Sequence, residues 1–240
     1  MTPADGGGGR LVGRIALVTG ASRGIGAAVA ERFAAEGAHV VATARTVGGL
    51  EELDDRIRAF GGSATLVPLD LRDFIKIDEL AAVLYQRYGH LDVLVGNAAL
   101  FGTFSPLGHI DPKLWGEVID LNLTANWRLI RAMDPLLRAA TAGRAIFVTS
   151  RLGSDAPPYY GPYAVSKAGL ETLVRIYAGE IALTQVRANL IEPGIVRTRL
   201  RARIFPGEDA TALPGPASVT DAFVDLACAE CPLNGDIIAL

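Results

Sequence analysis

Ile15-Ala16-Leu17-Val18-Thr19-Gly20-Ala21-Ser22-Arg23-Gly24-Ile25-Gly26 is the stretch from which the fold can be predicted. An apolar strand pattern runs directly into glycines spaced Gly-x-x-x-Gly-x-Gly, and an amphipathic helix pattern follows. Glycine lets the chain turn sharply and bring backbone N–H groups close to a pyrophosphate, to which the helix N-terminus adds partial positive charge. A strand, a glycine loop and a helix in this order predict a dinucleotide-binding unit. Its predicted contact residues are Gly20, Ser22, Arg23, Gly24, Ile25 and Gly26.

The rest of the chain repeats this alternation of strand and helix. Predicted strands are residues 15–19, 39–43, 64–68, 91–96, 145–149, 186–191 and 236–239. Predicted helices are residues 25–36, 50–60, 74–88, 112–140, 162–184 and 219–229. The strands are apolar along nearly their whole length, which indicates a parallel sheet covered on both faces. We therefore predict one doubly wound, seven-stranded α/β domain of the Rossmann type over residues 11–240, with residues 197–218 as a short lid.

Composition excludes several classes of protein. Half of the 240 residues are hydrophobic and a fifth are charged, so a sizeable core can be buried. A net charge of -3 argues against electrostatic binding to nucleic acid or to an anionic membrane. No apolar run approaches the ~18 residues that a membrane span needs, and residues 1–10, with Gly6 to Gly9, predict a flexible tail rather than a signal peptide. With only two cysteines, we expect a cytoplasmic protein.

Several later segments match one protein family in order along the chain. They are Leu69-Asp70-Leu71, Gly96-Asn97-Ala98-Ala99, Asn122, Ser150, Tyr163-x-x-x-Lys167 and Pro193-Gly194-Ile195-Val196-Arg197-Thr198. With the glycine loop, they resemble the classical short-chain dehydrogenase/reductase family. The resemblance implies a homodimer or homotetramer with Asn122, Ser150, Tyr163 and Lys167 as catalytic residues. The cofactor contacts that it implies beyond the glycine loop are Asp70, Leu71, Asn97, Tyr163, Lys167, Pro193, Gly194, Ile195 and Thr198.

The chemistry follows from the types of residue at these positions. Tyr163 and Lys167 share one helix face, and a neighbouring ammonium is expected to lower the pKa of the phenol, which is near 10 when unperturbed. Ser150 ends a predicted strand, where its hydroxyl could hold a substrate carbonyl oxygen beside the phenol, with Ser154 as an alternative. The resemblance implies that Asn122 holds a water next to Lys167. We expect hydride transfer between a nicotinamide and a ketone, aldehyde or alcohol.

The choice of nicotinamide cofactor depends on the end of the second strand. An acid there would accept from the ribose 2′-OH and repel a 2′-phosphate, but the sequence reads Val41-Ala42-Thr43-Ala44-Arg45-Thr46. Arg45, with Arg23 in the glycine loop, suits a phosphate because the guanidinium binds it bidentately. We predict a preference for NADP(H), with an NAD(H)-dependent alcohol dehydrogenase or a non-catalytic NAD(P)-binding sensor as alternatives.

Some features leave their roles open. The alternating arginines 197, 199, 201 and 203 could attract an anionic substrate group or be a solvated stretch. Cys228 and Cys231 form a Cys-x-x-Cys without the two further ligands of a zinc site, so no metal site is predicted. Gly96 and Ala99 depart from the Asn-Asn-Ala-Gly that the family usually shows.

Overall fold

A seven-stranded parallel sheet forms the centre of the computed structural model, which describes residues 9–240. The strands are β1 (Ile15–Thr19), β2 (His39–Ala44), β3 (Ser63–Pro68), β4 (Val93–Gly96), β5 (Arg144–Val148), β6 (Arg187–Glu192) and β7 (Ile237–Ala239). Their order is β3-β2-β1-β4-β5-β6-β7, so the order reverses between β1 and β4. The predicted doubly wound Rossmann-type sheet is confirmed, with strand ends displaced by one or two residues.

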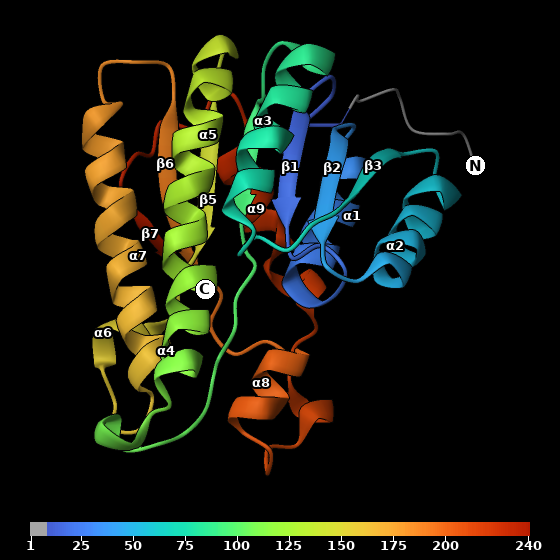
Figure 1. Cartoon of the computed structure of the whole chain (residues 1–240). Helices are drawn as coiled ribbons and strands as arrows, with labels where there is room; N and C mark the ends of the chain where they lie inside the picture. The colour runs from blue at the N-terminus through green and yellow to red at the C-terminus, as the bar shows by residue number, and fades with distance from the viewer. Residues whose placement is uncertain (1–8) are drawn as a thin grey trace.

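Helices cover both faces of this sheet. Figure 1 shows α3 (Phe74–Tyr88), α4 (Pro112–Ile119), α5 (Ala125–Ala139) and α7 (Gly161–Glu180) in front of the sheet, with α1 (Gly24–Ala35) and α9 (Thr220–Ala227) behind it. Helix α2 (Val47–Ala59) packs beside α1 on the same apolar cluster. In residues 9–240, no helix combines the length and the apolarity that crossing a membrane requires.

Each face of the sheet has its own apolar core. Phe33 of α1 lies in the cluster under α1, α2 and α9, and Phe147 of β5 lies in the cluster under α3, α5 and α7. Both side chains are fully buried. Because every central strand is covered twice, its residues are apolar on both sides, which is why the strands read as continuous apolar runs. The packed sheet holds the loops at its carboxyl edge in fixed positions.

The structure differs from the sequence prediction in three helical regions. The helix predicted over residues 112–140 contains a π-helical turn, Asp120–Thr124, between α4 and α5. A short helix, α6 (Arg151–Asp155), follows β5 directly, and the predicted lid contains α8 (Arg199–Ile204). Short helices are hard to predict because a few residues carry no periodicity.

Two residues of the predicted flexible tail, Gly9 and Arg10, belong to the described part of the structure. Residues 1–8 of that tail lie outside the described residues. Gly9 and Arg10 are packed, because a Cβ on Gly9 would lie 2.3 Å from the Glu36 carbonyl oxygen. The Arg10 backbone amide donates to the Glu36 carboxylate at 2.9 Å. The Arg10 guanidinium lies 2.7 Å from the carboxylate of Asp225 on α9. These contacts place Gly9 and Arg10 against the end of α1 and against α9.

Candidate active site

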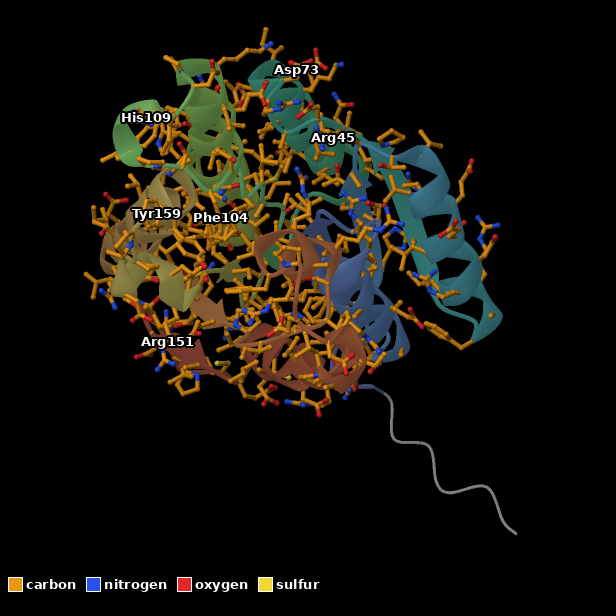
Figure 2. The ribbon with its side chains drawn as sticks, turned by 90° about the horizontal axis from the view of Figure 1, so that it is seen from below. Arg45, Asp73, Phe104, His109, Arg151 and Tyr159 are labelled. Atoms are coloured by element: carbon orange, nitrogen blue, oxygen red, sulfur yellow. The ribbon has the colours of Figure 1, made fainter. Side chains whose placement is uncertain are left out.

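A cavity of 690 Å³ opens at the carboxyl edge of the sheet. It begins at the loop between β1 and α1, crosses the ends of β4 and β5 and ends under α8. In Figure 2, which looks onto this edge, Arg45 lies near β2 and α3, whereas Phe104, Tyr159 and Arg151 lie on the opposite side, near α6 and α7. In open α/β sheets, ligands bind at such an edge where the strand order reverses. The cavity thus has two ends with different chemistry.

The glycine loop forms one end of the cavity. Gly20 and Gly24 have φ values of +66° and +60°, which favour glycine because a Cβ makes this backbone strained. A Cβ on Gly24 would meet only the Thr198 methyl group, at 3.5 Å, so the backbone faces open space there. The N-cap residue Arg23 makes no side-chain hydrogen bond to the start of α1, and the first turn of this helix contains no acidic residue. The first N–H groups of α1 can therefore receive a pyrophosphate, which fits a dinucleotide.

Gly26 has a different role from the one predicted. It does not line the cavity, and a Cβ on it would lie 2.4 Å from both the Gly20 carbonyl oxygen and the Asn97 side-chain nitrogen. Asn97, predicted as a cofactor contact, does line the cavity, and its Nδ2 donates to the Thr19 carbonyl oxygen at 2.8 Å. Gly26 thus lets α1 approach β1 and β4, and this packing accounts for the glycine without the predicted contact to the cofactor.

Thr19 is a site residue that the sequence reasoning missed. Its buried hydroxyl donates to the Val95 carbonyl oxygen at 3.1 Å and accepts from the amides of Asn97 and Ala98. One hydroxyl thus joins the ends of β1 and β4 where the cavity floor begins. A signal was present in the sequence, because Thr19 is a polar residue at the end of an apolar strand and next to the first glycine.

Gly96 explains one departure from the family pattern. A Cβ at this position would lie 2.4 Å from Cδ1 of Phe147, its register partner on β5, and 2.5 Å from Oδ1 of Asn126. An asparagine therefore has no room here. The ring of Phe147 fills the space that a side chain at position 96 would need.

Two arginines lie at the β2 end of the cavity. Arg23 and Arg45 both line it, and the Arg45 side chain is 56% exposed. Asp70 is directed elsewhere, because the Arg72 guanidinium donates to both of its carboxylate oxygens, at 3.2 and 2.8 Å, and holds the pKa of Asp70 below its ordinary value. Arg45 is 3.9 Å from the same carboxylate, too far for a hydrogen bond. Its guanidinium can therefore turn toward a phosphate.

The residues on either side of Asp70 face the cavity instead. Leu69 and Leu71 line it, whereas the Asp70 side chain does not. The position of Leu71 is compatible with its predicted contact to the cofactor. The Asp70 carboxylate, also predicted as a contact, binds the Arg72 guanidinium instead. Ser22 and Ile25 also line the cavity, close to the start of α1.

Ser150 and Tyr163 meet at the centre of the cavity. Ser150 is the N-cap of α6 and lies two residues past the end of β5, and its hydroxyl accepts from the Leu152 amide at 3.4 Å. Tyr163, on the first turn of α7, is 5% exposed. Burial raises the pKa of Tyr163 to about 12, and a hydrogen bond with Ser150 acts in the opposite direction. The phenol is therefore protonated at neutral pH and is placed beside a second hydroxyl.

Lys167 lies one helical turn beyond Tyr163 and is 2% exposed. Its Nζ donates to the Val148 carbonyl oxygen at 2.7 Å and lies 5.7 Å from the Tyr163 ring centroid. Burial lowers the pKa of Lys167 to about 8. The expected lowering of the phenol pKa by the ammonium is not seen here, because burial raises the pKa of Tyr163 and Nζ of Lys167 donates to β5 instead of to the phenol.

Asn122 lies behind the cavity, on the π-helical turn, and is fully buried. Its Oδ1 accepts from the Leu100 amide at 2.8 Å, and its Nδ2 donates to the Leu100 carbonyl oxygen and to the Ser166 hydroxyl, both at 2.9 Å. Both hydrogens of the side-chain amide are thus donated to protein groups, and its oxygen accepts one bond from the backbone. The Asn122 side chain therefore holds the loop after β4 in place.

The segment after β6 forms the lid side of the cavity. Pro193, Gly194, Ile195 and Thr198, the predicted cofactor contacts of this segment, all line it. Gly194 has a φ of +64°, and the Thr198 hydroxyl caps α8 by accepting from the Arg201 amide at 3.0 Å. Of the four alternating arginines, 199 and 201 line the cavity and 197 and 203 do not. Only two of the four arginines could therefore attract an anionic group in the cavity.

An aromatic cluster packs against Tyr163. Phe101 packs on Tyr163 with ring centroids 5.6 Å apart, on Phe104 at 4.9 Å and on Tyr160 at 5.9 Å. Ile204 of α8 is buried against this cluster. Figure 2 shows Phe104 and Tyr159 together on this side of the molecule. Leu152, Ile204 and Phe205 of the same cluster line the cavity together with Tyr163, so a substrate that reaches Tyr163 would meet apolar surface.

Comparison with known proteins agrees with the arrangement of these residues. The family model for short chain dehydrogenases matches residues 14–209. The uncharacterized oxidoreductase YciK of Escherichia coli K12 is 34% identical over 209 residues, which are 86% of this chain and 82% of YciK.

The chain belongs to the short-chain dehydrogenase family. Two solved members of the family resemble this short-chain dehydrogenase over nearly its whole length. One, from Pseudomonas syringae, has a TM-score of 0.94 at 34% identity and covers 100% of this chain and 99% of its own. The other, from Escherichia coli CFT073 in complex with NADPH, has a TM-score of 0.91 at 32% identity and covers 98% and 99%.

Family membership establishes the general activity. This short-chain dehydrogenase is an NAD(P)-dependent oxidoreductase. Its cysteines lie outside the cavity described above, because Cys228 and Cys231 line a separate hollow with Arg10 and Asp225. Cys228 is buried at the end of α9.

Proposed function

We propose that the enzyme reduces a ketone or aldehyde with NADPH, and carries out the reverse oxidation of an alcohol, at Ser150, Tyr163 and Lys167. The observation that supports this most strongly is the hydrogen bond between the half-buried Ser150 hydroxyl and the buried Tyr163 phenol, one helical turn from the buried Lys167. A dinucleotide fits the cradle formed by Gly20, Gly24 and the start of α1.

The roles of the side chains follow from their protonation and position. The bound nicotinamide supplies or accepts the hydride. Because burial keeps Tyr163 in its neutral form, the phenol can donate its proton to the oxygen of a carbonyl substrate. The Ser150 hydroxyl can donate a second hydrogen bond to that oxygen as negative charge develops on it. Lys167, fixed on Val148, places a positive charge beneath the phenol and can hold a ribose hydroxyl.

Exchange of Tyr163→Phe tests this assignment. The variant keeps the aromatic packing with Phe101, so NADPH should still bind, whereas turnover should fall at least about 1,000-fold because the proton donor is lost. NADPH fluorescence would measure binding, and oxidation of NADPH with a panel of ketones and aldehydes would measure turnover. Wild-type rates in the variant would rule out Tyr163 as the acid, and a wild type inactive on the whole panel would favour a non-catalytic sensor.

The preference for NADP(H) rests on Arg23 and Arg45, and on the NADPH complex of the Escherichia coli CFT073 relative. Exchange of Arg45→Asp would place a carboxylate next to the 2′-position, where it repels a phosphate and accepts from a ribose hydroxyl. The ratio of kcat/KM for NADPH over NADH should fall about 100-fold. Arg58→Asp, on the exposed end of α2, is the matched control. An unchanged ratio in the Arg45 variant would contradict the assignment.

A further inference from the structure

Two successive turns of α7 hold two successive residues of the β5 end. Lys167 Nζ donates to the Val148 carbonyl oxygen at 2.7 Å, and the next residue, Thr149, donates from its hydroxyl to Glu171 Oε1, also at 2.7 Å. Thr149 is 2% exposed and Glu171 is half-buried, so this hydrogen bond is only partly open to water. Ser150 follows directly. The position of the catalytic serine thus depends on a carboxylate that lies outside the family motifs used above.

Glu171 also belongs to the same helix face as the catalytic pair. Tyr163, Lys167 and Glu171 are spaced four residues apart on α7, so their side chains follow one another along the helix. The carboxylate favours the ammonium form of Lys167, which burial disfavours.

Other ionisable groups surround Lys167 on the neighbouring elements. Arg151 and Asp155 of α6 and Glu192 at the end of β6 line the same cavity. Asp120 of the π-helical turn interacts instead with Arg72. Tyr163 is the remaining titratable neighbour on α7. The anchored position of Glu171 distinguishes it from these groups, because Thr149 fixes its carboxylate against the strand that also holds Lys167.

We propose that Glu171 is a positioning residue for the reaction, which keeps Lys167 charged and fixes the end of β5, with Ser150, through Thr149. The proposal rests on the proposed function for its effect on turnover, but its electrostatic part can be measured without turnover. The chain has only three lysines, Lys76, Lys113 and Lys167, so the signals of ¹³C-labelled lysine side chains can be resolved by NMR. Loss of one signal in Lys167→Met assigns it.

The first experiment titrates that signal in the full chain. Glu171→Gln keeps an oxygen that can accept from Thr149 but removes the charge. We expect the titration midpoint of Lys167 to fall by about half a pH unit, a threefold change in its protonation equilibrium. Glu180→Gln, on the last turn of the same helix, is the matched control and should leave the midpoint unchanged. The same midpoint in Glu171→Gln as in the wild type, or an equal shift in Glu180→Gln, would overturn the proposal.

The second experiment separates the charge from the hydrogen bond by turnover. In Glu171→Gln, the decrease of kcat/KM at high pH should begin at lower pH, with the rate at pH 6 within about twofold of the wild type. In Thr149→Val, which keeps the volume and the carboxylate, kcat should fall about tenfold at every pH because Ser150 loses its support. A wild-type pH profile in Glu171→Gln, or wild-type kcat in Thr149→Val, would contradict the proposal. Absence of turnover in the wild type would contradict the proposed function and leave the NMR result valid.

Discussion

Exchange of Gly26→Ala tests whether this glycine contacts the cofactor or permits packing. The new Cβ would lie 2.4 Å from the Gly20 carbonyl oxygen, a backbone atom that cannot move without displacing the end of β1. Such overlap typically costs about 1–3 kcal/mol. Displacement of Asn97 would also weaken its hydrogen bond to Thr19, which is worth about 1 kcal/mol. The higher helix propensity of alanine offsets at most about 1 kcal/mol of this loss in the free energy of unfolding.

The free energy of unfolding should therefore fall by about 1–3 kcal/mol, as measured by urea unfolding without cofactor. The matched control is Gly116→Ala in α4, where the new Cβ meets nothing within 4 Å. This control should be neutral or gain up to about 1 kcal/mol. Equal unfolding free energies for the two variants would refute the packing argument. A Gly26→Ala protein with wild-type stability and weaker NADPH binding would restore the role predicted from the sequence.

Three further predictions concern the site and the lid. Lys167→Met should raise the free energy of unfolding at pH 7 by on the order of 2 kcal/mol, because folding lowers the pKa of this lysine to about 8. The unfolded chain binds the Lys167 proton more tightly than the folded chain, so the unfolding free energy of the wild type should rise from pH 8 to pH 10. The difference in unfolding free energy between Lys167→Met and the wild type should therefore narrow over this range, and a constant difference would contradict the prediction. Asn122→Ala should lower the free energy of unfolding by about 2–4 kcal/mol, since three buried hydrogen bonds to Leu100 and Ser166 are lost, and a urea midpoint equal to that of the wild type would contradict it. Arg201→Met removes both 2.7 Å contacts to the carboxylate of Glu208, so thermolysin should cleave the lid several-fold faster, and an unchanged rate would show that the ion pair does not hold the lid.

The alternation of strands and helices along the chain and the place of the site could be predicted from local patterns. β1 needs only its apolar run, and the glycine loop needs only backbone conformations that other residues disfavour at Gly20 and Gly24. The spacing of Tyr163 and Lys167 places them on one face of any helix. These features depend on neighbours in the sequence, which is why they can be read from it.

The roles of several residues could not be predicted because they depend on contacts between distant segments. Asn122 and Leu100 are 22 residues apart, and only the packed loop shows that the side-chain amide is already used. Thr19 and Val95 are 76 residues apart, and the hydroxyl that joins them gives no periodic signal. Glu171 looks like a solvated helix residue until β5 is placed beside it.

The sequence by itself determined that this protein is a doubly wound nucleotide-binding enzyme of the short-chain dehydrogenase family, since glycine positions, strand patterns and helical spacing are local properties of the chain. Only the tertiary structure decided how the site is charged. Burial raises the pKa of Tyr163 and lowers that of Lys167, whereas their spacing alone predicted a phenol acidified by the ammonium. The physical reason is that desolvation depends on every element packed around a group, and the sequence around that group does not contain this information.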